Sequence, residues 1–443
     1  MKIQQFVTES LGDASYLLVS GEVAAVIDPQ RDIRPYMVAA NDHRTTIRYV
    51  IETHVHNDYV SGARELAVYG AEIAAPAGAP LQFPHIPLAD GDVVKVGEAN
   101  IVAVPAPGHT YEHTAYLARD LNGVVQGAFT GGSLLMGAAG RTDLLGPDHA
   151  QELTRFQWET AGRLRDLVPA GADVLPTHGA GSFCSVTGED LGRSGPMSVE
   201  LQRNPALASA TYEAFRALQL ENPAPIPAYY RHMAPINIRG PRVYGAFPRP
   251  PLLTPGAFAS LPGDVFRIDV RARQDYVAGY LPGSLSVEES GSMLAYLSWL
   301  LPFKAPIALV TYGREHAERV SNELFRIGWE DIRAFIGSDA IEPPAVLRTA
   351  EVEEAAAILR GGTMPVIDVR YSQEHRSSPL PGARKLPFDD IQVWAQEIDA
   401  AGPVLLLCAS GQRSASAATF LRRHGVEAIP LLDGGVEDIR PLL

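Results

Sequence analysis

The sequence is poor in cysteine and in basic residues, and no apolar run is long enough to span a bilayer. Two cysteines among 443 residues exclude a disulfide framework. Acidic residues outnumber basic ones by 51 to 37, and the formal net charge of −14 disfavours nucleic acids and anionic membranes. We therefore expect neither a nucleic-acid nor a membrane partner, and we leave open whether the chain forms a homo-oligomer.

The start of the sequence, residues 1–10, lacks the basic segment and apolar stretch of a secretory leader. Together with the scarcity of cysteine, this predicts a cytoplasmic protein whose thiols stay reduced. The composition is otherwise that of a globular protein, with 46% hydrophobic and 20% charged residues. A chain of this length holds about three domains at roughly 150 residues each.

Short β-branched runs alternate with helical patterns through the N-terminal part of the chain. Such alternation is typical of an α/β sandwich. The pattern predicts strands at 15–19, 23–28, 46–52, 100–104, 114–117, 124–130 and 173–175, and helices at 33–41 and 149–167.

The C-terminal part of the chain contains an internal repeat, which follows a proline-rich stretch at 223–255. The matched segments are 267–271 with 366–370, 281–284 with 380–383, and 306–328 with 403–425. Collinear matches predict two copies of one small α/β domain with a parallel sheet. We expect four segments: a first domain at 1–195, a helical and proline-rich linker at 196–255 with little regular structure after 223, a first copy at 256–345, and a second copy at 346–443.

Cys408 follows the apolar run 404–407, which predicts a buried strand, and a helical pattern begins just after it. A loop between a strand and a helix N-terminus directs backbone N–H groups inward, and these donors favour an anion such as a thiolate or a persulfide. Gly411 permits a tight turn, and Arg413 adds a positive charge. We predict Cys408 and Arg413 as catalytic, with a loop formed by Ala409, Ser410, Gly411, Gln412 and Ser414.

The segment 408–414, with Asp368-Val369-Arg370 and Pro381-Gly382-Ala383, resembles the rhodanese family of sulfurtransferases. The resemblance implies that Cys408 accepts a sulfane sulfur and passes it on. A cysteine phosphatase, whose loop has the same Cys-to-Arg spacing, and a buried inert cysteine are the alternatives. In the first copy Thr311 stands in place of Cys408 and His316 in place of Arg413, so we expect that copy to be non-catalytic.

Histidines follow several predicted strands of the first domain, in the segments 53–59, 107–110 and 176–179. Strand ends of a layered α/β fold meet at one edge, and imidazoles with carboxylates suit Zn or Fe. The predicted ligands are His54, His56, Asp58, His109 and His178.

This pattern resembles the metallo-β-lactamase superfamily, and within it the persulfide dioxygenases fused to rhodanese domains. The segments 129–133, 140–144 and 178–182 carry the closer likeness. The resemblance implies an αββα sandwich, followed by two rhodanese domains. It also exposes two departures: Tyr59 stands where a histidine ligand is expected, and Gly132 where an aspartate is expected. The result would be a three-histidine site of His54, His56 and His109, a site completed by a replacement ligand such as His113 or Glu112, or a fold without a working metal site.

Two further residues, Arg141 and Asp143, either bind substrate at the mouth of the site or form a structural ion pair. Cys184 is interpreted as a buried structural thiol, and the alternative is a second sulfur relay near the metal cleft. The leading hypothesis is sulfane-sulfur metabolism, in which a small-molecule thiol or persulfide is the substrate of a Cys408 sulfurtransferase. The alternatives are a mononuclear Zn hydrolase acting on thioesters, like glyoxalase II, and a non-catalytic persulfide sensor.

Overall fold

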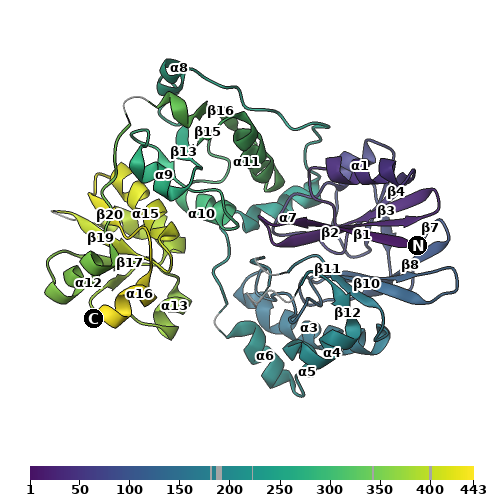
Figure 1. Ribbon diagram of the computed structural model, residues 1–443. Helices are drawn as coiled ribbons and strands as arrows, with labels where there is room; N and C mark the ends of the chain where they lie inside the picture. Colours follow the sequence, from purple (N-terminus) through teal and green to yellow (C-terminus); the bar gives the residue numbers. More distant parts are fainter. Residues whose placement is uncertain (180–181, 186–191, 222, 342–343, 399–401) are drawn as a thin grey trace. The chain divides into compact units, whose positions relative to one another are not determined.

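The computed structural model describes residues 1–179, 182–185, 192–221, 223–341, 344–398 and 402–443 (Figure 1). Contacts divide the chain into two compact units. The first unit comprises Met1–Ile226, Tyr230–Phe247 and Arg326–Gly328, and the second comprises Pro227–Tyr229, Pro248–Phe325 and Trp329–Leu443.

Two six-stranded sheets form the centre of the first unit in the described part of the chain. In spatial order, the first sheet contains β1 (Lys2–Thr8), β2 (Asp13–Ser20), β3 (Val23–Ile27), β4 (Thr46–Ile51), β5 (Glu72–Pro76) and β6 (Ile86–Leu88). The second contains β12 (Gly195–Pro196), β11 (Asp173–Pro176), β10 (Val125–Gly131), β9 (Thr114–Arg119), β8 (Ala99–Pro105) and β7 (Val93–Val96). One apolar core includes residues of both sheets, and within it the rings of Tyr16 and Phe129 lie 5.4 Å apart.

Helices cover the outer face of each sheet and complete the αββα sandwich that the sequence predicts (Figure 1). Those packed on the first sheet are α1 (Arg34–Asp42) and α2 (Ala63–Ala67). The second sheet carries α3 (Pro147–Leu167) and α4 (Met197–Arg203), followed by α5 (Pro205–Ala208) and α6 (Tyr212–Leu220). None of the helices in the described residues is long and apolar enough to cross a membrane.

The proline-rich stretch contains a helix, α7 (Tyr230–Arg239), so the prediction of little regular structure is wrong there. Buried contacts stabilise this helix despite its internal Pro235. Asn237 of α7 donates to the carbonyl oxygens of His56 and Tyr59, each at 2.9 Å. The helix therefore belongs with the first unit and supports its histidine-bearing loop.

The second unit contains two four-stranded parallel sheets with the same strand order among the described residues. They are β14 (Leu285–Ser286), β13 (Phe266–Asp269), β15 (Ile307–Thr311) and β16 (Ile332–Gly337), and β18 (Arg384–Lys385), β17 (Val366–Asp368), β19 (Val404–Leu407) and β20 (Ala428–Pro430). Every residue of β15 and β19 is buried, as their apolar sequences predict.

The helices of the second unit also follow a repeated pattern. Helices of the first copy are α8 (Pro255–Ala259), α9 (Arg273–Ala278), α10 (Met293–Leu300) and α11 (Arg314–Arg326), and the short η1 (Ser338–Ala340) follows. The second copy has α12 (Val352–Gly361), α13 (Ser372–Ser377), α14 (Ile391–Trp394), α15 (Gln412–Arg423) and α16 (Val436–Ile439), with short turns η2 (Phe388–Asp390), η3 (Ala395–Glu397) and η4 (Arg440–Leu442). The predicted segment boundaries, including a separate linker, remain predictions.

The repeat extends to a buried ion pair at the end of each first strand. Arg271 binds Asp269 through Nε at 2.9 Å, and Arg370 binds Asp368 through Nε at 3.0 Å. Each guanidinium also donates to a backbone carbonyl eight residues further along, at 2.8 and 2.7 Å. The same side-chain geometry in both copies supports a common origin of the two sheets.

The two aspartates differ in their pKa because one residue of the repeat has changed. Burial raises the pKa of Asp269, and its bonds with Arg271 do not fully offset that effect. Burial acts on Asp368 in the same direction, but hydrogen bonds from His375 and Arg370 outweigh it and lower the pKa to about 2. The first copy has Tyr276 at the position of His375, and the Tyr276 hydroxyl donates instead to the carbonyl oxygen of Ser284.

We predict that Arg271→Ala lowers the free energy of unfolding of the second unit by about 3 kcal/mol, because it leaves the carboxylate of Asp269 buried and unpaired. Urea unfolding followed by tryptophan fluorescence measures this change. Arg319→Ala is the matched control, since Arg319 is 55% exposed where it pairs with Glu289, and its loss should cost less than about 1 kcal/mol. Equal effects of the two variants would contradict the prediction.

Candidate functional sites

Cys408 lies at the end of β19, in the loop that leads into α15. Its side chain is 1% exposed, and the backbone N–H of Gly411 donates to Sγ over 3.1 Å. Helix α15 begins at Gln412, directly after that donor, so the positive end of the helix dipole faces the loop. Backbone polarity at this position favours an anionic sulfur, as the sequence indicates.

Two glycines are required by the close packing of the loop. A Cβ atom on Gly411, whose φ is +88°, would lie 1.6 Å from the carbonyl oxygen of Leu432. A Cβ atom on Gly435 would lie 1.8 Å from the carbonyl oxygen of Ala409. The segment after β20 thus packs directly against the Cys408 loop. A side chain at Gly411 or Gly435 would separate the two segments.

Arg413 is already paired within the protein. Both of its terminal nitrogens donate to the carboxylate of Glu374, one of them over 2.9 Å, and the guanidinium lies 4.2 Å from the ring centroid of Tyr371. Ser414 Oγ lies 3.5 Å from the Cys408 sulfur and donates to the carbonyl oxygen of Leu431. Arg413 therefore contributes charge and rigidity behind the loop, while its hydrogen bonds are used by Glu374.

The first copy holds the Cys408 loop through an arginine and a glutamate. Arg273 donates to the carbonyl oxygens of Ser410, at 3.1 Å, and Leu432, at 3.3 Å. Glu288 accepts from Arg273 at 2.7 Å and from the side-chain amide of Gln412 at 2.8 Å. The loop is therefore bonded on both sides of Gly411 by residues of the neighbouring sheet.

The matching loop of the first copy has no thiol. Thr311 Oγ1 donates to the carbonyl oxygen of Gly313 at 3.1 Å, and His316 Nδ1 accepts from the backbone N–H of Tyr312 at 3.1 Å. Within the described residues the Thr311 hydroxyl donates to carbonyl oxygens, which do not act as a base. The first copy therefore keeps the frame of the loop without a nucleophile.

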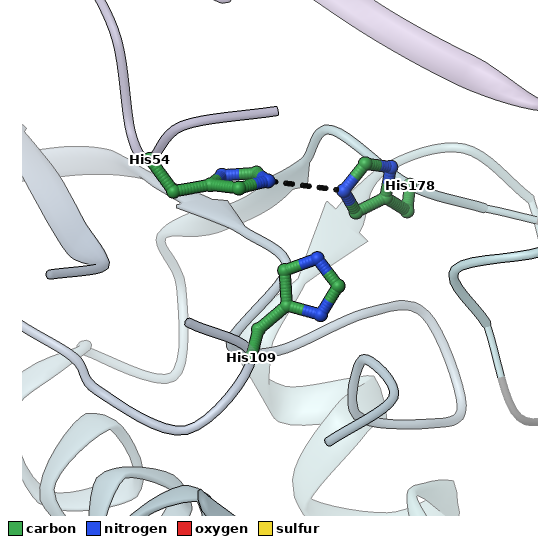
Figure 2. A group of neighbouring side chains, drawn as sticks. All are labelled: His54, His109 and His178. Atoms are coloured by element: carbon green, nitrogen blue, oxygen red, sulfur yellow. Dashed lines mark hydrogen bonds between the residues drawn. The ribbon is translucent and has the colours of Figure 1, made fainter. Parts of the chain in front are cut away.

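A histidine cluster occupies the strand ends of the first unit. His54 follows β4, His109 follows β8 and His178 follows β11, and each side chain is 1% exposed. Figure 2 shows the three rings converging, with His54 Nε2 and His178 Nε2 3.4 Å apart. The ligand atoms of these three residues all lie within 4.8 Å of one another, so the structure can hold a metal there.

The remote nitrogen of each ring is held by an oxygen. His54 Nδ1 lies 2.8 Å from Thr53 Oγ1, whose own proton is donated to Asp28 over 2.7 Å. His109 Nδ1 donates to the carbonyl oxygen of Arg141 at 2.8 Å. His178 Nδ1 donates to Asp13 at 2.9 Å, with Asp58 at 3.2 Å. Such partners place a proton on Nδ1 and make Nε2 the remaining ligand atom of each ring. On His178, whose pKa is raised to about 10, a metal would displace the second proton from Nε2.

Burial and charge set the protonation of these rings in the absence of a metal. Burial lowers the pKa of His109 to about 3, and it lowers that of His54 as well, so both are neutral. Burial opposes charge on His178 too, but Asp58 and Asp13 overcome this and raise its pKa to about 10. His109 Nε2 is buried and has no hydrogen-bond partner. An orphaned imidazole nitrogen aimed at two others fits a metal site.

His56 is turned toward a separate group of polar side chains. Its Nε2 lies 2.9 Å from Glu52, 3.3 Å from Asp28 and 3.1 Å from the hydroxyl of Tyr59. Burial opposes protonation of His56, but Asp28 and Glu52 raise its pKa well above the usual value. Tyr59, which stands where a histidine was expected, stacks on His56 with ring centroids 4.4 Å apart.

Gly132 stands where an aspartate is expected, and the ring of His109 lies next to this glycine. A Cβ atom on Gly132 would lie 2.3 Å from His109 Cδ2, and one on Gly140 would lie 2.9 Å from His109 Nδ1. The imidazole therefore occupies the space that a side chain at 132 would need. His113, a conceivable replacement ligand, accepts instead from the backbone N–H of Gly132 at 2.9 Å.

The other predicted residues take structural positions. Arg141 is 2% exposed and forms a bidentate pair with Asp143, at 2.9 and 2.8 Å, which matches the structural alternative. A substrate-binding role for the pair remains a prediction. Burial raises the pKa of the Cys184 thiol, so this cysteine stays protonated. Ala180 and Gly181 of the 178–182 motif lie outside the described residues.

Sequence reasoning missed three buried acids in the first unit: Asp13, Asp28 and Glu52. Asp28 accepts from the backbone and side chain of Thr53 and from Thr177. Asp28 and Glu52 lie at the ends of predicted strands, and Glu52 directly precedes the histidine motif. This placement at strand ends is the sequence feature that could have identified both. The sequence gives no such signal for Asp13, because its partner His178 lies 165 residues further along the chain.

Known proteins resemble this chain over parts of its length. A model of the rhodanese-like domain matches residues 351–441. Hydroxyacylglutathione hydrolases of Cereibacter sphaeroides and Rhodospirillum rubrum are 32% and 34% identical, over 36% and 35% of this chain. The matches cover 58% and 56% of those proteins, so the chain spans little more than half of their length.

A solved metallo-β-lactamase from Staphylococcus aureus subsp. aureus COL shares the fold with a TM-score of 0.68 at 24% identity. The match covers 78% of this chain and 99% of that one. The first copy of the repeat has the topology of the second, and its assignment to the same family is a proposal. Residues 351–441 are a rhodanese-like domain, and the N-terminal unit that precedes the repeat has the metallo-β-lactamase fold.

Proposed function

We propose that the protein is a sulfurtransferase that carries a sulfane sulfur on Cys408. The observation that carries this proposal is the 3.1 Å hydrogen bond from the Gly411 N–H to the Cys408 sulfur, at the start of α15. That donor and the helix dipole stabilise an anion at Sγ, and the terminal sulfur of a persulfide is also an anion.

The transfer proceeds in two displacements. The Cys408 thiolate attacks the outer sulfur of a donor such as thiosulfate, the S–S bond of the donor breaks, and sulfite leaves with the bonding electrons. The resulting Cys408 persulfide is then attacked at its terminal sulfur by a thiolate or cyanide. The Cys408 thiolate leaves and is ready for another cycle.

The pairing of Arg413 supports sulfur transfer over phosphatase chemistry. A cysteine phosphatase binds the phosphate oxygens with two guanidinium hydrogen bonds. Here the edge of Arg413 between its two terminal nitrogens is directed to Glu374, which leaves the Nε edge for any second bidentate partner. A single transferred sulfur atom makes no such demand, so the loop suits a small sulfur anion better than a phosphate ester.

We predict that Cys408→Ser abolishes sulfur transfer from thiosulfate to cyanide, because serine cannot form a persulfide. Cys184→Ser should keep most of the activity, since Cys184 is a buried, protonated thiol. Thiocyanate production measures the rate, and mass spectrometry of the intact protein measures the added sulfur. Activity retained by Cys408→Ser, or a persulfide found on Cys184 alone, would refute the proposal.

The contacts of Arg273 give the first copy a positioning role in the same reaction. We predict that Arg273→Ala lowers kcat of sulfur transfer about tenfold, because the loop loses two carbonyl contacts, equivalent to about 1.4 kcal/mol of barrier. The alkylation rate of Cys408 by iodoacetamide should fall in parallel, whereas a general loss of stability would raise that rate by exposing the buried thiol. Arg319→Ala, an exposed arginine of the same copy, should leave both rates unchanged.

A metal-dependent hydrolase is a second candidate function, for the N-terminal unit. Its support is the set of three histidines without a carboxylate at Gly132, together with similarity to hydroxyacylglutathione hydrolases. A metal there supplies an activated water, and the residues around it exclude bulk solvent.

We predict that zinc-loaded protein hydrolyses an S-acyl glutathione and that Cys408→Ser does so at the same rate, because the two sites use different residues. Release of free thiol measures hydrolysis, and an oxygen electrode with glutathione persulfide measures the competing reaction. Oxygen uptake without thioester cleavage would instead favour a dioxygenase.

A further inference from the structure

We infer that His54, His109 and His178 bind a single Zn²⁺ as a three-imidazole site. This set differs from the predicted trio of His54, His56 and His109, and from a site with two histidines and one carboxylate. The inference concerns the metal and its ligands, and it does not depend on sulfur transfer by Cys408.

The separation of the ligand atoms fits a tetrahedral zinc ion. Two imidazole nitrogens, each about 2.0–2.1 Å from zinc, lie about 3.3–3.4 Å apart when the coordination is tetrahedral. His54 Nε2 and His178 Nε2 are 3.4 Å apart. A ring nitrogen of His109 lies within 4.8 Å of the ligand atoms of the other two residues, and its Nε2 has no hydrogen-bond partner in the described part of the chain. A small closure of the His109 ring completes the set.

Hydrogen bonds to Nδ1 orient all three rings in the same way. Each Nδ1 is held by an oxygen, from Thr53, Arg141 or Asp13. Zinc-bound histidines in proteins carry such oxygen partners, which fix the tautomer and the orientation of the ring. Asp13 and Asp58 beside His178 also supply negative charge that balances a buried divalent cation.

His56 is held away from His109 by its own contacts, although it forms other groups of possible ligands with Asp28 and His54 and with Asp58 and His178. Glu52, Asp28 and Tyr59 hold its Nε2, and Asn237 holds the backbone carbonyls of His56 and Tyr59. Among the described residues, His109 shares a cluster of ligand atoms within 4.8 Å only with His54 and His178. The rival set would use His56 Nδ1, which is buried without a hydrogen-bond partner, and would require His56 and His109 to approach each other.

The absence of a carboxylate at Gly132 favours zinc at the set of His54, His109 and His178. Two neighbouring groups, Asp28 with His54 and His56, and Asp58 with His56 and His178, do contain a carboxylate, but neither includes His109. Iron in oxygen-dependent enzymes is held by two histidines and one carboxylate, whereas three histidines and one open position are a zinc arrangement. A side chain at Gly132 would collide with His109, so this chain cannot add the carboxylate while His109 stays in place. The open position then accepts water or a small anion.

Two measurements on the full, unmodified chain test the inference. Elemental analysis after dialysis against equal concentrations of zinc and iron should give one zinc per chain. An anomalous difference map at the zinc edge should place the ion on Nε2 of His54, His109 and His178. Two ions per chain, stoichiometric iron, an ion bonded to His56, or no bound metal would each overturn the inference.

Variants provide a second, independent test by zinc affinity rather than by activity. His109→Ala and His178→Ala should each weaken zinc binding at least a hundredfold, and His56→Asn less than tenfold. Gly132→Asp should also weaken zinc binding, because the new side chain displaces His109, whereas a two-histidine, one-carboxylate site predicts a gain of iron. His149→Ala, a histidine on the exposed end of α3, is the matched control.

Circular dichroism of each variant separates lost ligands from lost folding. If His178→Ala unfolds, the anomalous map on the unmodified chain still decides the ligand set. A folded His178→Ala protein that binds zinc as tightly as the unmodified chain would overturn the inference.

Discussion

Burial of polar groups at strand ends is the constraint on which both units depend. Where water is excluded, each donor and acceptor must find a partner inside the protein, and each charge must be balanced. The repeated pairs Asp269–Arg271 and Asp368–Arg370 meet this demand in the second unit. In the first unit, carboxylates and carbonyl oxygens orient the histidine rings. In both units, hydrogen bonds and ion pairs to buried groups thus fix the orientation of side chains near the candidate sites.

The two copies of the repeat share one fold but contribute different residues to the Cys408 loop. The second copy has Cys408, while the first copy has Thr311 and His316 in the matching loop. The first copy instead contributes Arg273 and Glu288, which hold the backbone and side chain of the Cys408 loop. The copy without a cysteine thus contributes to the structure of the loop that has one.

Much of the fold could be predicted because it depends on local patterns. The apolar run at 404–407 forms β19 with those same bounds, and the predicted strands around the histidine motifs all form. The repeat predicted the shared topology of the two sheets. Side-chain partners were not predictable, since Asp13 with His178 and Arg413 with Glu374 are distant in sequence. Helix α7 was missed because its stability comes from packing and not from its proline-containing sequence.

The ring of His109 packs between Gly132 and Gly140, and this position limits which residues can replace either glycine. Because the imidazole fills the space beside residue 132, a side chain there collides with the ring in its present position. An acidic residue at 132 would require a coupled movement of the 107–110 loop and of the carbonyl at Arg141 that holds the ring. The effect of a single substitution at 132 therefore depends on whether the 107–110 loop moves with it.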